Sequence, residues 1–404
     1  MAHALMLSAA SILWLSACGP SSRIPEVSQQ MIEEEAEKQN ELAFKDSMKD
    51  EERLNTVAFR LETANSEFCG KMVAARTGVI LLDQDTVAKQ FREVSQKLLG
   101  VGELPTVMSV VPGSPAGSAG LQPGDVITEI NGEATRSGND GLKQFRTAAR
   151  STGSGLLELT IEHKGSSQKV TMTPVNACSF PVTLMKSDAI NAWTDGNSIN
   201  VTKAMMSFAK TDDELALIVG HELGHCTMAH MRAKETNAMI GLVAGGIAGA
   251  LLTGVTGVNM INTMANEGAL IGMGAKSQGF ETEADYVGTY YAARAGYDVT
   301  NAGDFWRRLA SKHPDAIHAA ALSSHPSTAA RFVTLEETVK EIQKKQAAKE
   351  SLIPSKEGTS ASSPQQAENA QPAEATPPSQ PAPASNVTSA TPGQSPHPMV
   401  NPAP

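Results

Sequence analysis

Apolar residues recur at helical spacing at the end of a charged N-terminal stretch. Four of them fall at positions i, i+3, i+4 and i+7 and so share one helix face: Leu54, Val57, Ala58 and Leu61. The residues before this face are dense in Glu, Lys, Gln and Asp. We predict a tether or exposed helix over residues 19–53 and the start of a folded unit over residues 54–95. Within that unit, residues 72–82 predict a strand or one arm of a hairpin.

Short apolar strands alternate with turn signals between residues 96 and 175. Gly, Pro and Asn mark turns at residues 113–116, 123–125 and 131–132. Alternating apolar positions then flank a further turn, at Leu157, Leu159, Ile161, Val170 and Met172. This period of two predicts a hairpin with one buried face. A helix is expected over residues 140–150.

A capping box marks the start of the helix with the clearest chemistry. Thr211 can accept a hydrogen bond from the backbone of Glu214, and Glu214 can reach back. An apolar run continues this helix into the sequence HELGH at residues 221–225. His221 and His225 are one turn apart on the same face, so both imidazoles can bind one metal ion.

The remaining parts of a zinc site are predicted from spacing. Glu222 is offset by about a hundred degrees around the helix axis, which suits a general base for a metal-bound water but not a ligand. A catalytic zinc site needs a third protein ligand from elsewhere in the chain. Glu281 can supply it from a second helix, and Asp285 on the same face can hydrogen-bond a ligand histidine. Glu283 points elsewhere and is expected to be solvated.

Three motifs occur in the order of one zinc peptidase family. HELGH, ETEAD at residues 281–285 and Ser324-His325-Pro326 with Arg331 resemble the family of CAAX prenyl endopeptidases and bacterial and mitochondrial membrane quality-control proteases. The soluble lipoprotein and periplasmic branch fits best. The resemblance implies an α+β fold, with a mainly helical zincin-type domain and a small sheet over residues 180–345. Residues 54–95 are expected to be the N-terminal part of this catalytic unit.

The same resemblance implies an activity. It implies a zinc endopeptidase with one Zn²⁺ per chain that cleaves misfolded or misassembled envelope proteins. His325 is the family's candidate for stabilising the tetrahedral oxyanion, with Arg331 nearby. The alternative for His325 is a side chain that only caps the turn before Pro326. An edge strand at residues 198–202 is the family's candidate for aligning substrate backbone, and its alternative is an ordinary sheet strand.

The run GSPAGSAGLQPGDVITEINGE closely resembles the second half of a bacterial PDZ domain. We therefore assign residues 96–175 to an inserted PDZ-like β-barrel or sandwich. PDZ domains bind extended peptides, often C-termini, as an added strand. Leu99, Gly100, Val101 and Gly102 are expected to form the loop that binds the peptide carboxylate. The alternative is a structural insert with a closed groove.

The first residues predict export. Ala4 to Leu15 form an apolar run that is too short to span a membrane, and the following Leu15-Ser16-Ala17-Cys18 resembles a bacterial lipobox. Residues 1–18 would then be a signal peptide, Cys18 would be lipidated, and the protein would be periplasmic and anchored to a membrane, with Gly19 favouring the outer membrane. No Lys or Arg precedes the run, so a buried N-terminal helix remains the alternative. In an oxidising compartment Cys69 and Cys178 are candidates for a disulfide.

Composition limits the partners and the end of the chain. The formal net charge is -10 and no basic stripe is interleaved with aromatic residues, which argues against nucleic acid. Of the 22 prolines, 12 lie between Pro354 and Pro404. Residues 351–404 are therefore expected to be a disordered tail, because they cannot bury enough apolar surface.

His230, Cys226 and the apolar residues 238–257 are predicted to have no catalytic part. His230 is half a turn from His221 on a continuous helix and would face away from the site, and Cys226 is expected to be a small buried residue. Residues 238–257 are long and apolar enough for a membrane span. One crossing would separate the two ligand helices unless residues 259–275 return. The preferred interpretation is therefore a mobile flap or loop over the cleft, which could touch the membrane.

Two other function classes remain open. The PDZ-like domain and a catalytically muted cleft would suit a chaperone or assembly scaffold. A peptidase that processes one specific substrate is the third possibility.

Overall fold

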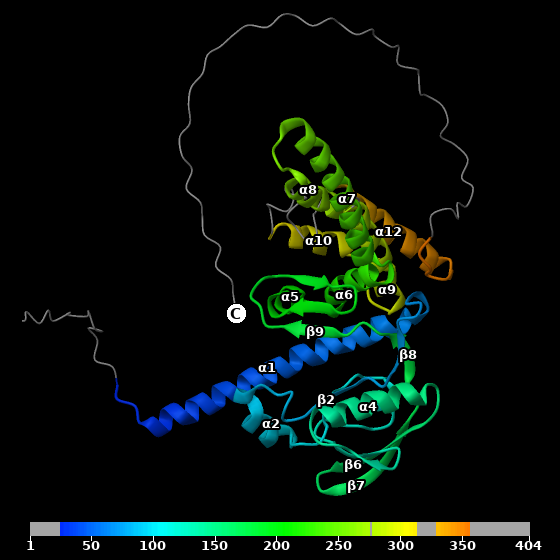
Figure 1. Cartoon of the computed structure of the whole chain (residues 1–404). Coiled ribbons are helices and arrows are strands. Elements are labelled where there is room, and N and C mark those ends of the chain that lie inside the picture. Colours follow the sequence, from blue (N-terminus) through cyan, green and yellow to red (C-terminus); the bar gives the residue numbers. More distant parts are fainter. Residues whose placement is uncertain (1–24, 275–276, 313–328, 356–404) are drawn as a thin grey trace, which may run out of the picture. The chain divides into compact units, whose positions relative to one another are not determined.

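The computed structural model describes residues 25–274, 277–312 and 329–355 (Figure 1). Three predictions lie outside these residues: the signal peptide with Cys18, the Ser-His-Pro motif with His325, and nearly all of the predicted tail. The described part combines helices with small sheets, as expected for an α+β chain.

The helix predicted around Leu54 is longer than the sequence indicated. Helix α1 spans Gln29–Ala64 and begins at Ser28, whose side chain accepts a hydrogen bond from the backbone of Met31. Its residues 29–40 are exposed, and all four residues of the predicted apolar face are buried. The tether and the start of the folded unit are therefore one continuous helix, because no breaker separates them.

The PDZ-like part is built on a sheet with strand order β2-β3-β4-β6-β7, and β5 pairs with β4. The bounds of its elements are β2 (Val79–Leu82), η2 (Lys89–Phe91), α2 (Arg92–Leu99), β3 (Thr106–Val110), α3 (Pro115–Ser118), β4 (Val126–Ile130), β5 (Glu133–Ala134), α4 (Asn139–Thr152), β6 (Leu157–His163) and β7 (Ser166–Met172). The predicted hairpin is formed by β6 and β7, with Leu157 opposite Met172 and Leu159 opposite Val170. These apolar positions are buried with Phe145 of α4, so the alternation does define the core face.

The second core gathers the other helices around a small sheet. Its strands run in the order β10-β11-β9. The bounds are η1 (Ser66–Phe68), β9 (Val182–Met185), β10 (Ala192–Thr194), β11 (Ile199–Thr202), α5 (Lys203–Phe208), α6 (Asp212–Thr227), α7 (His230–Thr256), α8 (Ile261–Gly274), α9 (Ser277–Arg294), α10 (Ala302–Ala310) and α12 (Ala329–Ala347). Helices α1, α6, α9 and α12 supply most of its fully buried side chains, including Leu61, Leu215, Tyr290 and Ile342.

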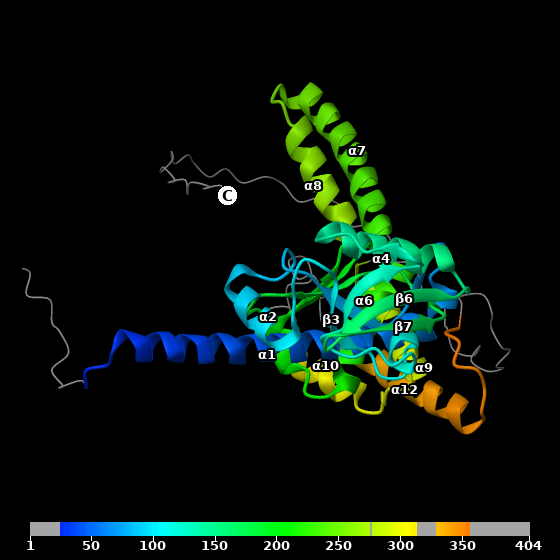
Figure 2. The same ribbon diagram turned by 90° about the horizontal axis from the view of Figure 1, so that it is seen from below.

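The segment predicted to be a flap is a helical hairpin. Residues 259–275 do return, as α8 packs along α7 through glycine pairs that bring the two backbones together. Figures 1 and 2 show α7 and α8 standing out from the other helices rather than lying over them. The prediction of a flap over the cleft was therefore wrong, because the Gly and Ala residues form a helix-packing seam instead of a flexible loop.

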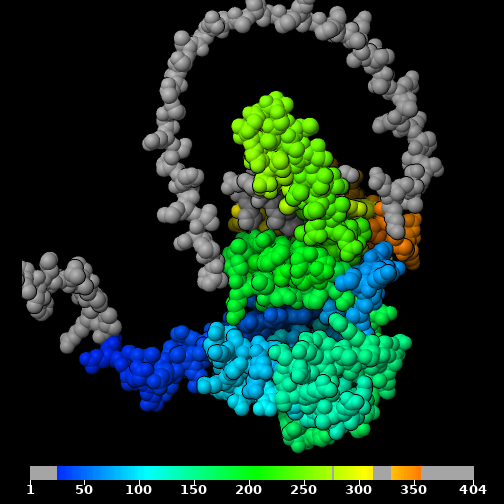
Figure 3. Space-filling view, in the orientation of Figure 1, coloured from blue at the N-terminus to red at the C-terminus, as the bar shows by residue number. Residues whose placement is uncertain are grey.

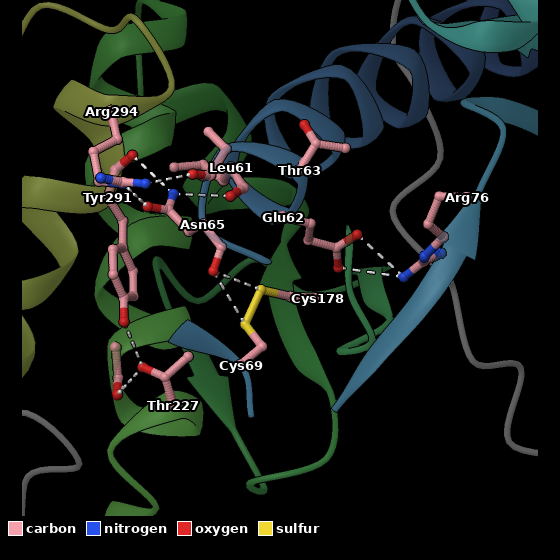
Figure 4. Close-up of a disulfide and its surroundings, with 12 residues drawn as sticks. Leu61, Glu62, Thr63, Asn65, Cys69, Arg76, Cys178, Thr227, Tyr291 and Arg294 are labelled. Carbon is pink, nitrogen blue, oxygen red and sulfur yellow. Dashed lines mark hydrogen bonds and ion pairs between the residues drawn. A yellow bond between two sulfur atoms is a disulfide. The ribbon is translucent and has the colours of Figure 1, made fainter. Parts of the chain in front are cut away.

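A disulfide closes the chain segment that contains the PDZ-like sheet. Cys69 bonds Cys178, 109 residues further on, and strand β1 (Val73–Arg76) pairs antiparallel with β8 (Val175–Cys178) beside it. Figure 4 shows the bond next to Asn65, whose side chain donates to the carbonyls of Leu61 and Tyr291. Both ends of the inserted domain are thus fixed to the junction of α1 and α9.

We expect the double variant Cys69→Ala/Cys178→Ala to lose about 3 kcal/mol of unfolding free energy, because an open chain regains the entropy of a long loop. Urea denaturation would measure this loss. Reduction with a phosphine should destabilise the wild type by a similar amount and leave the double variant unchanged. A wild type that is indifferent to reduction would contradict the prediction.

A buried carboxyl group lies where α1 passes the first strand of the insert. Glu62 is only 4% exposed, and one of its carboxylate oxygens lies 3.1 Å from a guanidinium nitrogen of Arg76 (Figure 4). Burial raises the pKa of Glu62 to about 8, and Arg76 offsets only part of that effect. Between the ordinary pKa of 4.5 and this value, the folded protein binds more protons than the unfolded chain.

The unfolding free energy should therefore fall as pH rises through this window. We expect Glu62→Gln to remove that contribution, so that the variant gains a few kcal/mol over the wild type between about pH 5 and pH 8, at about 1.4 kcal/mol for each pH unit. Urea denaturation at the two pH values measures the difference. Glu52→Gln, an exposed change on the same helix, serves as the control. Parallel pH profiles for wild type and Glu62→Gln would show that Glu62 does not titrate in this window.

Candidate metal centre

The two helices that carry the predicted ligands meet through glycine. A side-chain carbon on Gly220 of α6 would lie 2.7 Å from the carbonyl oxygen of Gly288 on α9, and one on Gly288 would lie 2.6 Å from the backbone nitrogen of His221. Both distances are too short for any other residue. A side-chain carbon on Gly224 would lie 3.2 Å from the carbonyl oxygen of Ala284, which is tight but less so than at Gly220 and Gly288. The close crossing brings the HELGH turn of α6 beside the first turns of α9.

The start of α6 follows the predicted cap. Thr211 accepts a hydrogen bond from the backbone of Glu214 at 3.2 Å, while the Glu214 carboxylate accepts from the backbone of Lys210 at 2.7 Å. Three acidic side chains occupy the first turn, where their negative charges interact favourably with the positive end of the helix dipole. The helix then runs unbroken to Thr227 and buries every residue from Leu215 to Cys226.

His221, His225 and Glu281 form one buried donor group. Their ligand atoms all lie within 4.8 Å of one another. The Nε2 atoms of the two imidazoles are 3.1 Å apart, and each lies 3.4 Å from a carboxylate oxygen of Glu281. Each of the three residues is at most 2% exposed. The arrangement that the spacing predicted is therefore present.

This donor group fits a zinc ion. Two imidazole nitrogens and one carboxylate oxygen make up a common protein ligand set of catalytic zinc, which leaves one position for water or substrate. Burial alone would lower the pKa of His221, but its contacts with Asp285 and Glu281 raise that pKa to about 9. The two carboxylates therefore stabilise positive charge at the imidazoles. A bound divalent cation would provide that charge.

Asp285 and Arg331 surround the donors. Asp285 lies 2.9 Å from Nδ1 of His221, as predicted for the group that fixes the ring's orientation. The guanidinium of Arg331 donates two hydrogen bonds to the Asp285 carboxylate, at 2.7 and 2.8 Å. Although burial alone would raise it, Arg331 and His221 lower the pKa of Asp285. Trp306 lies against both the His221 ring and the Arg331 guanidinium.

His230 belongs to the centre, contrary to the prediction. The helix ends at Thr227, and Ala229 adopts a left-handed conformation with φ of 55°, so α7 restarts at His230 and turns its ring back. Its Nδ1 lies 2.9 Å from Nδ1 of His225, and its Nε2 lies 2.9 Å from a carboxylate oxygen of Glu283. The prediction failed because it assumed one continuous helix. Glu283, expected to be solvated, is half exposed but engaged in this contact.

Comparison with known sequences identifies the domain. Residues 164–339 match Peptidase family M48, and residues 106–162 match a PDZ domain. The part of the chain that holds the metal centre is thus similar to Peptidase family M48. Mitochondrial metalloendopeptidase OMA1 of Arabidopsis thaliana is 29% identical over 169 residues, which cover 41% of this chain and 32% of that protein.

Two bacterial relatives match over similar lengths. The beta-barrel assembly-enhancing protease of Yersinia pestis is 30% identical over 143 residues, covering 33% of this chain and 29% of the relative. Metalloprotease LoiP of Escherichia coli is 27% identical over 143 residues, covering 35% of this chain and 56% of the relative. The chain thus spans about a third of the first two relatives named and about half of the third.

Glu222 and Cys226, which directly follow the two histidine ligands on α6, are both buried. Glu222 is buried beside His221, at 2% exposed. Cys226 is buried against the hydroxyl of Thr194 at 3.0 Å, and burial raises the pKa of its thiol to about 12, so the thiol stays protonated and does not compete as a ligand. His325 lies outside the described residues.

The strand predicted to be an edge is not one. Strand β11 pairs with β10 on one side and with β9 on the other, so residues 199–202 lie in the middle of the sheet. The edge on the side of α6 is β10, whose Thr194 contacts Cys226. The prediction used only the local pattern of residues 198–202, whereas the order of strands in a sheet is set by tertiary pairing.

The predicted carboxylate loop is not at the groove of the PDZ domain. Leu99 is the last residue of α2, and Gly100 after it is in a left-handed conformation. The carbonyl of Gly102 accepts a hydrogen bond from the backbone of Gln84. Strand β2 is the edge of the large sheet, and a pocket of about 360 Å³ lies between it and α4. That pocket is lined by residues of β2 and the loop before it, which include Gly78, and by Leu142 and Phe145 of α4. Side chains of α1, among them Phe59, also line it. In the sequence, Gly78 directly before the apolar run 79–82 is the feature that could have indicated the groove beside β2.

We expect His230→Ala to raise the zinc dissociation constant about tenfold or more, because His225 loses the partner that holds its ring. Competition with a chromophoric chelator measures the constant. His163→Ala, which changes a histidine of the PDZ domain, is the matched control. Unchanged zinc affinity in His230→Ala would show that His230 only fills space.

Proposed function

We propose that this protein is a zinc-dependent endopeptidase that hydrolyses peptide bonds in proteins of the bacterial envelope. The observation that carries the proposal is the buried group of His221, His225 and Glu281, with Glu222 adjacent to the first ligand on the same helix. A purely structural zinc site would normally use a fourth protein ligand. The names of the bacterial relatives, a beta-barrel assembly-enhancing protease and a metalloprotease, support an envelope protease.

The chain's own residues account for the proton transfers. When bound, the zinc ion activates water and polarises the peptide carbonyl. Glu222 accepts the proton of the attacking water and returns it to the leaving amine. Asp285 orients His221 through Nδ1, and Arg331 holds Asp285 in place by its paired hydrogen bonds. Arg331 is therefore a positioning residue, and His325 remains the proposed oxyanion donor.

Two sheet edges suit an extended polypeptide. Strand β10 offers backbone groups beside α6, so a substrate could align there by strand addition. The edge strand β2 and helix α4 of the PDZ domain form a second groove, which fits a C-terminal peptide. The first edge would present the scissile bond, and the second would hold a distant part of a substrate or partner.

The N-terminal sequence supports a place in the envelope. Cleavage before Cys18 and its lipidation would leave the protein on the periplasmic face of a membrane, and the following Gly19 favours the outer membrane. The disulfide between Cys69 and Cys178 suits this oxidising compartment.

We expect Glu222→Gln to lower the turnover of an unfolded protein substrate such as casein by about a thousandfold, because the general base is lost. Its zinc content should equal that of the wild type. Glu235→Gln, an exposed change at the start of α7, should leave turnover unchanged. A chaperone or scaffold would keep its envelope function in the Glu222→Gln variant, and that outcome would overturn the enzyme proposal.

A further inference from the structure

The hairpin of α7 and α8 exposes an unusual amount of apolar surface. Between Ala238 and Gly274 the only charged residue is Glu267. The large apolar side chains of α7 point outward, and the most exposed are Val255 at 85%, Leu251 at 70% and Ile240 at 63%. Ile271 of α8 is 73% exposed. Figure 3 shows this hairpin standing clear of the other described elements. Surface of this extent needs a partner.

Glycines fill the inside of the hairpin. A side-chain carbon on Gly241 would lie 2.0 Å from the carbonyl oxygen of Gly268, and one on Gly245 would lie 2.0 Å from that of Met264. The small residues therefore face each other while the large apolar residues face away. A water-soluble hairpin buries its large apolar side chains inside, whereas small-residue seams are characteristic of helices packed in lipid.

Backbone amides in the turn between the helices form hydrogen bonds within the turn itself. The side chain of Thr253 accepts from the backbone of Met260 at 2.9 Å, and that of Asn259 accepts from Ile261 at 3.2 Å. The amide of Gly257 donates to the carbonyl of Thr253, and that of Val258 to the side chain of Thr256. At a tip exposed to water, these backbone groups could form hydrogen bonds with solvent. At a tip that enters hydrocarbon, they must form hydrogen bonds within the protein.

The lengths fit a hairpin that enters and leaves on the same side. The apolar part of α7, residues 238–256, spans about 29 Å at 1.5 Å per residue, close to the thickness of the hydrocarbon core. Helix α8 is shorter, at about 21 Å. Both helices lead back to the metal centre, since α7 begins at His230 and the chain after α8 continues into α9. The ligand helices therefore stay together on one side of the membrane.

We propose that the α7–α8 hairpin inserts into a lipid bilayer and holds the metal centre at its surface. The hydrocarbon covers the outward apolar side chains, and the polar first turns of α7, with Arg232 and Glu235, remain at the headgroups. The site would then meet polypeptide segments at or near the membrane surface. This inference concerns membrane insertion and does not depend on peptidase activity.

The test places a fluorescent reporter in the hairpin. The full chain carrying Val255→Trp is reconstituted into phosphatidylethanolamine and phosphatidylglycerol vesicles whose acyl chains are brominated, with the unsubstituted chain as background. We expect several-fold more quenching than for Leu156→Trp, a matched reporter at an apolar position of the PDZ domain that is 63% exposed. Because the readout is specific to one position, attachment through the N-terminus does not affect it.

A second variant separates lipid from protein as the covering partner. Adding Leu251→Glu to Val255→Trp should lower quenching to the level of the reporter at position 156, because a carboxylate is costly in hydrocarbon. Equal quenching of the reporters at positions 255 and 156 would overturn the proposal. Blue-shifted emission from position 255 without quenching by bromine would also overturn it, since a second copy or another protein would then cover the hairpin. Retained zinc content and circular dichroism verify that each variant is folded.

Discussion

The close crossing of α6 and α9 is the contact on which the site depends. Gly220 and Gly288 let the two backbones approach to a distance that no side chain at these positions would allow. Only at this distance can a carboxylate on α9 reach the imidazoles of α6. The ligands themselves contribute little to holding the helices together, because buried carboxyl groups cost free energy until they are paired. Apolar packing around Leu215, Leu223 and Tyr290 stabilises the crossing instead.

The charges around the crossing explain why the site selects a cation. Glu222, Glu281 and Asp285 are all at most 5% exposed, and the basic side chains near them are Arg331 and Lys234. Arg331 is largely engaged with Asp285, and Lys234 lies 3.7 Å from Glu281. A divalent ion at the imidazoles offsets the remaining negative charge without a further basic residue.

The sequence was informative wherever chemistry is encoded by local spacing. His221, His225 and Glu281, with Asp285 behind them, could be predicted because one helical turn separates the members of each pair. The turn and strand pattern of the PDZ domain was equally local. His230 was missed because one left-handed residue, Ala229, ends a helix that the pattern predicts to continue. The central position of β11 and the groove beside β2 depend on which strands pair across the fold, and no spacing along the chain records that.

Along the chain, the α7–α8 hairpin lies between the second ligand, His225, and the third ligand, Glu281. Its first residue, His230, contacts His225, so α7 cannot fold down over the site without withdrawing the ring that orients a ligand. The glycine seam, with backbones in contact along its length, makes the connection stiff. A stiff element rooted at the donors suits fixing the direction of the site better than opening and closing it. If lipid holds the far end, the orientation of α6 and α9 relative to the membrane follows from the same contacts that position the imidazoles.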